Sequence, residues 1–208
     1  MSYLVLVRHG QSAWNELGQW TGLTDVELTD KGRAEARSAA KTLEGLTFSA
    51  AYTSNLKRAQ DTLAEILDEL HQTELEAQKS AALNERDYGI LTGKNKWQAK
   101  DEYGEEQFMK WRRGWNEPIP GGETLQDVHD RAVPYYQQHI LADLKAGKNV
   151  IVAAHGNTLR ALVKHIERIA ETDVPALEIG TGEVYLYEID SDSGQVLAKD
   201  IKVTGSKA

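Results

Sequence analysis

Apolar and polar positions along the 208-residue chain follow two spacings, that of buried strands and that of amphipathic helices. Continuous apolar runs at residues 4–7 and 149–154 are typical of strands buried on both faces, the usual state of a parallel strand. Residues 50–53 form a shorter run of the same kind. Because strands alternate with helical stretches, the pattern predicts an α/β protein, a three-layer α/β/α sandwich with a largely parallel central sheet.

The helical stretches have apolar residues three and four positions apart. They cover residues 30–43, 56–70, 123–144 and 157–169. Thr29 or Asp30 can cap the first of them. Near the C-terminus, strands at 183–189 and 195–203 flank a turn over 190–194 and predict a hairpin. No internal repeat or low-complexity linker is visible, so we expect residues 1–208 to form a single domain.

Composition and charge narrow the class of protein. The net charge is −8 and no long basic run occurs, which argues against nucleic acid as a partner. No apolar run approaches the ~20 residues of a membrane helix, and no signal peptide is visible, so we expect no membrane association. The absence of cysteine excludes disulfides and thiolate chemistry. Together these features predict a cytoplasmic protein.

The two long apolar runs share an ending, because each is followed by a His-Gly pair, at His9 and at His155. Parallel strands bring such ends to one edge of the sheet, where open α/β sheets bind ligands. Arg8 precedes the first pair, and Arg58 falls in the first turn of a helix, a position that favours phosphate. The pattern predicts a pocket for a tetrahedral dianion. Each histidine alone is more often a surface or satisfied core residue, and Arg8 has the alternative of an ordinary carboxylate partner.

These residue types suit phosphoryl transfer. A neutral imidazole is nucleophilic near pH 7, and arginine forks neutralise the equatorial oxygens of the transferring group. A proton must also reach or leave the substrate oxygen, and Glu85 in a polar loop is the candidate carboxyl group. A salt bridge between Glu85 and Arg86 is the alternative that spacing alone favours.

Seven stretches of the chain also carry a family resemblance. They are LVRHGQSAWN, TGLTDVELTDKG, YTSNLKRAQDT, LNERDYGILTGKNK, YGEEQFMKWRRGW, PGGETLQDVHDR and AAHGNTLRALVKH. In this set and order, over roughly residues 3 to 189, the chain resembles the cofactor-dependent phosphoglycerate mutases of the histidine phosphatase superfamily.

The resemblance implies a phosphoglycerate mutase-like fold and a role for each matching position. His9 corresponds to the residue that becomes phosphorylated, Glu85 to the general acid and base, and His155 to a residue that stabilises the transferring phosphoryl group. Arg8 and Arg58 complete the implied catalytic set. The implied substrate-binding residues are Gly10, Gln11, Ser12, Asn15, Thr21, Gly22, Arg86, Tyr88, Lys96, Arg112, Arg113, Gly156 and Asn157.

The implied activity is that of a glycolytic and gluconeogenic isomerase acting on small phosphorylated three-carbon acids. It would interconvert 3-phosphoglycerate and 2-phosphoglycerate through a phosphohistidine primed by 2,3-bisphosphoglycerate, with no metal. The resemblance also allows a homo-oligomer, dimer or tetramer. The chain departs from many members at Asp87, in a shorter insert after Arg113 and in a shorter C-terminal tail. These departures leave the subunit contacts open.

Three alternatives compete with this interpretation. A phosphatase of the same fold would pass the phosphoryl group to water, whereas a mutase must hold a second anionic group. The charged, tryptophan-rich segment 83–122 supplies cations for that task and is predicted to cover the substrate, although a solvated charged face is its other interpretation. The cations concerned are Arg86, Lys94, Lys96, Lys110, Arg112 and Arg113. On this basis we favour the mutase.

The other two alternatives lack support in the chain. A non-catalytic phospho-ligand binding module tends to lose its nucleophile or proton donor, whereas His9, His155 and Glu85 are all present. A metal site would call for His-Glu-x-x-His or a comparable pairing, which does not occur. The turn at 190–194 is similar to the start of a calcium loop, but Ile201 at its twelfth position cannot bind calcium.

Overall fold

Six strands form one mixed sheet in the computed structural model, which describes residues 1–202. They are β1 (Ser2–Arg8), β2 (Ala50–Thr53), β3 (Ala77–Lys79), β4 (Val150–Ala154), β5 (Val184–Ile189) and β6 (Val196–Lys202). Their order across the sheet is β3-β2-β4-β1-β5-β6. The first four strands of this order are parallel, and β5 and β6 run antiparallel to their neighbours. The predicted sheet and C-terminal hairpin are thereby confirmed, except that Val203 lies outside the described residues.

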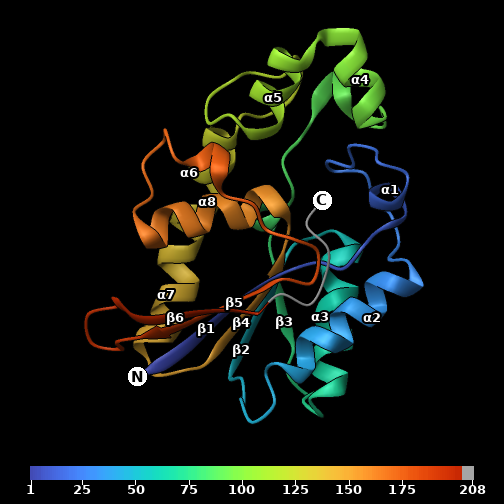
Figure 1. Ribbon diagram of the computed structural model, residues 1–208. Helices are drawn as coiled ribbons and strands as arrows, with labels where there is room; N and C mark the ends of the chain where they lie inside the picture. The colour runs from blue at the N-terminus through green and yellow to red at the C-terminus, as the bar shows by residue number, and fades with distance from the viewer. Residues whose placement is uncertain (203–208) are drawn as a thin grey trace.

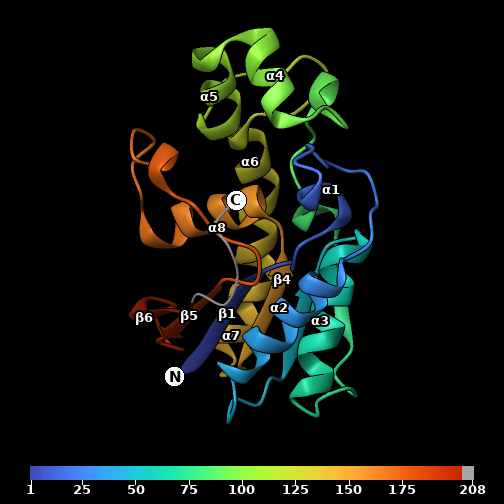
Figure 2. The same cartoon turned by 45° about the vertical axis from the view of Figure 1, so that its right-hand side comes forward.

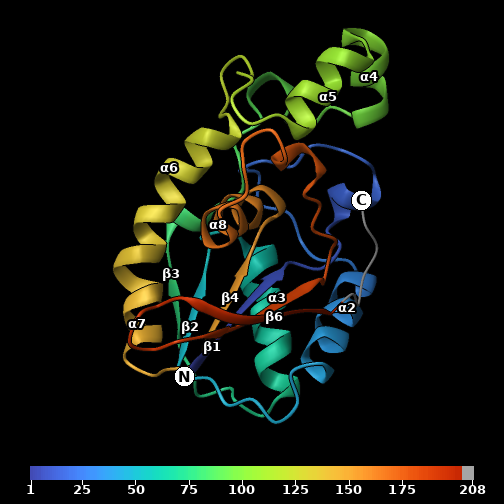
Figure 3. The ribbon, with the colours of Figure 1, turned by 60° about the vertical axis from the view of Figure 1, so that its left-hand side comes forward.

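Helices cover both faces of the sheet (Figures 1 and 3). The longer ones are α2 (Asp30–Lys41), α3 (Lys57–Glu69), α4 (Lys96–Tyr103), α5 (Glu105–Arg113), α6 (Leu125–Tyr135), α7 (Leu141–Lys145) and α8 (Gly156–Glu167). Shorter helical turns are α1 (Ala13–Glu16), η1 (Ala81–Leu83), η2 (Gly89–Leu91), η3 (Tyr136–Ile140) and η4 (Val174–Ala176).

Alternation along the buried strands decides which helices each face meets, because successive side chains point to opposite sides. Val5 and Val7 of β1 pack with α2 and α3. Leu4 and Leu6 of the same strand pack with α6, η3, α7 and α8. The two cores confirm the predicted three-layer α/β/α sandwich.

The long helix predicted over residues 123–144 is interrupted. It begins at Leu125 and passes from α6 into a π-helical turn, η3, before α7. Pro134 lies just before the π turn, and its ring has no N–H to donate and crowds the carbonyl four residues earlier. Strand β3 was also not predicted, because its three residues, Ala-Gln-Lys, lie at the sheet edge and lack the apolar pattern of the central strands.

Helices α4 and α5 lie beyond the carboxyl ends of the parallel strands, above α8 (Figures 1 and 2). They have a small core of their own, in which Phe108 and Trp111 pack against Trp20 from the loop after α1. Trp115, next along the chain, packs instead with Leu125 and other residues of α6 and α8. Among the described residues, none of the helices combines the length and apolar character needed to cross a bilayer.

The loop after β1 is held by a backbone contact between two glycines. A Cβ atom on Gly10 would lie 2.1 Å from the carbonyl oxygen of Gly32, and a Cβ atom on Gly32 would lie 2.1 Å from that of Gln11. Gly32 lies within α2, and the Thr29 side chain that caps this helix accepts its N–H. The first turn of α2 therefore packs directly on the chain that follows His9.

We expect Gly32→Ala to destabilise the protein, although alanine is the better helix former. The added methyl meets backbone atoms that cannot move independently, and such overpacking costs about 1–3 kcal/mol. Urea unfolding measures the difference. Ser38→Ala, an exposed change in the same helix, is the control and should be neutral or slightly stabilising. A Gly32→Ala protein as stable as the wild type would show that the contact is not close.

Candidate active site

His9 and His155 lie side by side at the carboxyl ends of β1 and β4. The two strands pair in parallel with Arg8 opposite Ala154, so the residue after each strand emerges at the same edge. The centroids of the two imidazole rings are 5.0 Å apart, with the ring planes tilted by 60°. Both side chains are buried. The sheet register that the apolar runs predict thus places the two histidines in contact.

The hydrogen bond of His9 decides which ring nitrogen is free. Nδ1 lies 2.7 Å from the carbonyl oxygen of Gly10, and because a carbonyl only accepts, Nδ1 donates and carries the proton. Burial lowers the pKa of His9 well below its ordinary 6.5, and the positive charges of Arg58 and Arg8 lower it further. At neutral pH the ring is uncharged, with an unprotonated Nε2 that is able to act as a nucleophile.

His155 has the opposite tautomer. Its Nε2 lies 2.7 Å from the hydroxyl oxygen of Ser54, whose proton has no other acceptor among residues 1–202 and is therefore donated to the ring. We therefore place the His155 proton on Nδ1, an atom with no hydrogen-bond partner among residues 1–202. Burial and the charge of Arg58 lower the pKa of His155 well below 6.5. This histidine is consequently a neutral N–H donor.

The two arginines are held by their outer nitrogens. Arg58 donates from Nη1 to the carbonyl of Thr24 at 2.9 Å and from Nη2 to that of Gly22 at 2.8 Å. Arg8 donates from Nη1 to the carbonyl of Ile179 at 2.6 Å. In the described part of the chain the Nε atoms of both arginines are buried without a partner. Burial lowers the pKa of Arg58 to about 10, so this group stays charged at neutral pH.

Buried N–H donors that lie close together without partners indicate a binding site for an anion. Arg8 Nε, Arg58 Nε and His155 Nδ1 are three of the five buried side-chain atoms without partners in residues 1–202. Leaving such a group unsatisfied costs about 1–3 kcal/mol, more for a charged one. Helices α3 and α8 also begin here without a side-chain cap from the preceding residue, so their positive dipole ends face the site, although Asp25 accepts the N–H of Lys57 and Glu85 that of Asn157. The arrangement fits a phosphoryl group beside His9.

Arg8, Arg58 and His155 form a cradle for such a phosphoryl group. Glu85 lies across the cavity from this cradle. One carboxylate oxygen, Oε1, accepts from the backbone N–H of Arg86 at 2.8 Å and from the side-chain amide of Asn157 at 3.2 Å. The Arg86 guanidinium points elsewhere and donates to the backbone carbonyls of Glu123 and Trp111. The interpretation of Glu85 and Arg86 as an ordinary salt bridge is therefore wrong. The glutamate instead faces the cavity that His9 lines.

A buried arginine sets the orientation of Asn157. Arg160 donates from Nη1 to Asn157 Oδ1 at 3.0 Å, which directs the amide nitrogen to Glu85 and, at 2.7 Å, to the hydroxyl oxygen of Tyr88. Because that oxygen accepts, the Tyr88 proton is free to point into the cavity. Burial, with the charge of Glu85, raises the pKa of Tyr88 to about 12, so the hydroxyl remains a donor.

A second group of cations adjoins the first. Lys96, Arg112 and Arg113 line a cavity that also contacts Arg8 and Glu85. Burial, with the charges of Arg8 and Arg112, lowers the pKa of Lys96 to about 8. Arg113 pairs with Glu178 at 2.6 Å. This group lies where α4 and α5 overhang the sheet, so a molecule with two anionic ends would meet cations at both.

The structure brings most of the predicted site residues to these two adjoining cavities. Those that line them are Arg8, His9, Asn15, Thr21, Gly22, Arg58, Glu85, Tyr88, Lys96, Arg112, Arg113, Gly156 and Asn157. His155 contacts the His9 ring.

The remaining predicted residues do not line the two cavities. Gln11 accepts from the Thr29 hydroxyl through its side-chain oxygen, and Ser12 caps α1. The backbone of Gly10 contacts α2, and Arg86 binds carbonyls of the 111–123 segment. Asp87, where the chain departs from many members of the family, accepts the N–H of Gly89 in a turn.

Sequence reasoning did not single out Ser54, Arg160, Trp20 or Glu178. Ser54 follows the carboxyl end of β2, and Arg160 lies three residues after Asn157 on one helix face, so both had a detectable signal. Trp20 and Glu178 come from loops, where no periodic pattern reveals what a side chain will contact. No three His, Asp or Glu side chains converge to hold a metal within residues 1–202.

Comparison with known proteins gives the family. The pattern of the family described as histidine phosphatase superfamily (branch 1) matches residues 4–201. The chain belongs to the histidine phosphatase superfamily. The 2,3-bisphosphoglycerate-dependent phosphoglycerate mutase of Bradyrhizobium diazoefficiens is 50% identical over 192 residues, 91% of this chain and 93% of that protein. The protein of the same name from Parvibaculum lavamentivorans is 46% identical, with 96% of each chain covered.

Solved structures of the superfamily share the fold at lower identity. A mycobacterial glucosyl-3-phosphoglycerate phosphatase in complex with VO3 has a TM-score of 0.83 and 25% identity, and the match covers 99% of this chain and 100% of that chain. A protein described as mycobacterial hydrolase 1 has a TM-score of 0.81 and 24% identity over 100% and 99% of the two chains. The superfamily fold is thus shared by chains whose names differ.

The two buried histidines should make stability fall on acidification. Their folded pKa values lie below 6.5, so below about pH 6.5 the unfolded chain binds protons that the folded chain does not. Each such histidine removes ~1.4 kcal/mol of unfolding free energy per pH unit in that range. Urea unfolding between pH 6.5 and 5 in phosphate-free buffer measures how steeply the unfolding free energy changes with pH. For His9→Gln this slope should correspond to the uptake of one proton fewer than for the wild type. An unchanged slope would mean that His9 is protonated in the folded protein.

Proposed function

We propose that this chain is a 2,3-bisphosphoglycerate-dependent phosphoglycerate mutase, which interconverts 3-phosphoglycerate and 2-phosphoglycerate through a phosphohistidine. The observation that carries the proposal is the unprotonated Nε2 of His9 beside three unpaired N–H donors, next to a second group of cations. The names of relatives that are 46–50% identical over nearly the whole chain support it.

The residues divide the chemistry as follows. Phosphorylated His9 donates its phosphoryl group to the free hydroxyl of the monophosphate: the N–P bond breaks, the new P–O bond forms, and Glu85 accepts the hydroxyl proton. The bound bisphosphoglycerate then reorients. Its other phosphate returns to Nε2 of His9 as that P–O bond breaks, and Glu85 gives its proton to the leaving oxygen. Priming by 2,3-bisphosphoglycerate is the same return step.

The cradle stabilises the charge of the transferring group. Arg8, Arg58 and His155 donate to its equatorial oxygens from atoms that are already desolvated, so little reorganisation is needed. In this proposal no metal takes part, because the two guanidinium groups supply the neutralising charge. Asn15, Gly156 and Asn157 also border the transferring phosphoryl group. The residues that contact the rest of the substrate are Thr21, Gly22, Tyr88, Lys96, Arg112 and Arg113. The walls of the two cavities are supported from behind by four further residues, Gly10, Gln11, Ser12 and Arg86.

A phosphatase is the second candidate, because the solved structure at 25% identity is named a phosphatase. Both activities share the phosphohistidine step and differ in what accepts the group. A mutase must retain an intermediate with two phosphates and a carboxylate. Lys96, Arg112 and Arg113 supply positive charge for that retention beyond the cradle, which favours the mutase.

Three further features belong to the proposal. Residues 83–122, within a single domain, cover the bound substrate, because α4 and α5 overhang the cavities (Figure 2). A glycolytic and gluconeogenic role places the protein in the cytoplasm. A dimer or tetramer stays a prediction.

The function is tested by assaying interconversion of the two phosphoglycerates in EDTA, with and without 2,3-bisphosphoglycerate. We expect activity that requires the bisphosphate and is unaffected by the chelator. Labelled bisphosphate should also leave an acid-labile, alkali-stable phosphate on the wild-type protein but not on His9→Gln.

Two outcomes would contradict the proposal. Label retained by His9→Gln would place the nucleophile elsewhere, and activity lost in EDTA but restored by manganese would indicate a metal-dependent class. Lys41→Gln, an exposed change at the end of α2, is the control and should retain both label and rate.

Replacing Arg112 and Arg113 together should separate the mutase from the phosphatase. A hydrogen bond to a charged group contributes ~1.5–3 kcal/mol, so losing two lowers mutase kcat/KM by about two to four decades. The cradle around His9 remains, so the bisphosphate escapes or its phosphoryl group passes to water. The ratio of phosphate release to isomerisation should therefore rise.

The matched control for the double variant is Lys110→Gln. Lys110 lies on the same helix, but it is exposed and pairs with Glu106. We expect it to leave both rates unchanged. If the double variant keeps mutase activity within a factor of a few, Arg112 and Arg113 belong to a solvated face and do not hold the substrate.

A further inference from the structure

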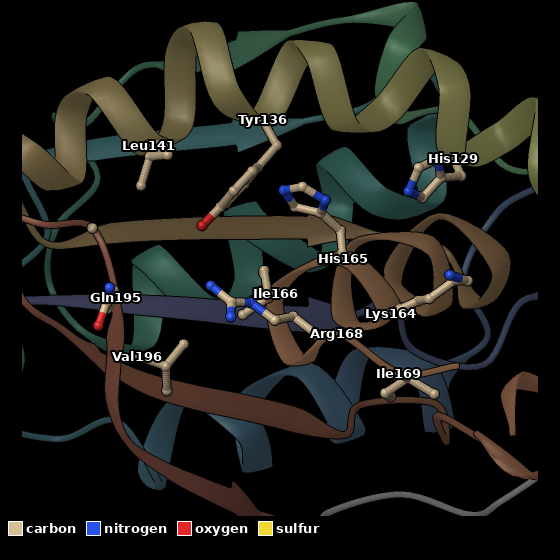
Figure 4. Close-up of a pocket in the computed structure, with 11 residues that line it drawn as sticks. His129, Tyr136, Leu141, Lys164, His165, Ile166, Arg168, Ile169, Gln195 and Val196 are labelled. Carbon is tan, nitrogen blue, oxygen red and sulfur yellow. The ribbon is translucent and has the colours of Figure 1, made fainter. Parts of the chain in front are cut away.

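A second cavity lies at the opposite end of α8 from His9. Its volume is about 670 Å³, within the range of about 300–1,000 Å³ that is typical of small-molecule sites. It is enclosed by η3, the C-terminal end of α8 and the turn between β5 and β6 (Figure 4). None of its lining residues lines the cavities around His9. The reaction proposed above therefore gives this cavity no role.

Tyr136 is the buried polar group that faces this cavity. The side chain is 4% exposed, and its hydroxyl points into the open space (Figure 4). The hydroxyl forms no hydrogen bond with any described residue. Burial raises the pKa of Tyr136 to about 12, so the group keeps its proton at neutral pH. Because no described residue accepts its proton, the hydroxyl is available to donate to a molecule that occupies the cavity.

Two cations face the same space. Arg168 follows α8 with a left-handed backbone (φ 55°), and its guanidinium points into the cavity from the side opposite Tyr136 (Figure 4). Within residues 1–202 it forms no ion pair or hydrogen bond through its side chain. Lys164 lies with its ammonium 4.5 Å from the ring centroid of Trp115 and is likewise without an acidic partner among these residues.

Several acidic side chains of the neighbouring elements have partners of their own, whereas the Asp192 carboxylate in the hairpin turn has none among residues 1–202. Glu167 binds Lys199 and the hydroxyl of Tyr187, both at 2.6 Å. Asp190 accepts from Ser193 in the hairpin turn. Asp130 lies 3.0 Å from His129, beside His165. The described lining of the cavity carries two cations, Lys164 and Arg168, and no acidic side chain, in a chain whose net charge is −8.

An apolar wall completes the cavity. Leu141, Ile166 and Val196 line the part away from Lys164. We propose that the cavity binds a small organic anion with a phosphate, phosphonate or carboxylate head on an apolar body. The head accepts from the Tyr136 hydroxyl and the Arg168 guanidinium, and the body packs on the apolar wall.

Titration with phenylphosphonate tests this proposal, because the probe has both parts and cannot be hydrolysed to phosphate. Histidine ring signals in NMR spectra report each site separately: His165 and His129 report the second cavity, and His9 reports the catalytic one. We expect the His165 and His129 signals to move with a binding curve of their own. Benzyl alcohol, which has the ring without the charge, should not move them.

Variants identify the groups that hold the head. Arg168→Gln should weaken binding at the second cavity about tenfold, and Tyr136→Phe, which keeps the packed ring, should weaken it several-fold. Neither should change the curve followed at His9. Lys41→Gln removes one positive charge on the other face of the sheet and should leave both curves unchanged.

The proposal is overturned by any of three results. The first is that the His165 and His129 signals stay fixed at millimolar probe while that of His9 moves. The second is that benzyl alcohol binds as well as phenylphosphonate, which would make the cavity merely apolar. The third is that Arg168→Gln and Lys41→Gln weaken binding equally. Binding would then depend on the net charge of the protein and not on the position of Arg168.

Discussion

Two guanidinium groups buried beside an uncharged imidazole create the positive potential around which this end of the molecule is arranged. Burial, with the charges of Arg58 and Arg8, keeps the pKa of His9 low, and the carbonyl of Gly10 keeps its proton on Nδ1. Desolvation of the two guanidinium groups costs free energy, and burial lowers the pKa of both arginines. An anion bound between them would offset that cost.

The surrounding fold is needed to hold these charges in place. Backbone carbonyls at Gly22, Thr24 and Ile179 accept from outer nitrogens of the two arginines, so the Nε atoms of both and Nη2 of Arg8 remain for a ligand. On the other side, Arg160 orients Asn157, and Asn157 in turn contacts Glu85. These hydrogen bonds hold the charged groups in fixed positions around the cavity.

The segment that overhangs the site, residues 83–122, bears on which molecule accepts the phosphoryl group. Helices α4 and α5 pack around Trp20, Phe108 and Trp111, so the cations they carry are held over the cavities by a core and do not lie on a bare surface. A cradle alone serves both a mutase and a phosphatase. In the proposed mechanism the second group of cations, Lys96, Arg112 and Arg113, is what favours retention of the intermediate over its release.

The sequence by itself determined the parts of the protein that depend on local pattern. The apolar runs around Val5 and Val152 specify central parallel strands, and the His-Gly pairs that follow them place His9 and His155 at one edge. Helix starts and the hairpin could be predicted for the same reason, since period and turn residues are local properties. The order of the seven motifs also indicated the family.

Tertiary structure decided which side chains contact one another, and therefore every feature of the site that depends on such contacts. Whether Glu85 pairs with Arg86 could not be read from their adjacency, because the Arg86 guanidinium finds carbonyls at Trp111 and Glu123 that are distant in sequence. The roles of Ser54 and Arg160 and the tautomers of both histidines follow from single hydrogen bonds across the fold. The cavity at Tyr136 likewise exists only because η3, α8 and the β5–β6 turn converge. Such contacts join residues far apart in the chain, and no periodicity in the sequence records them.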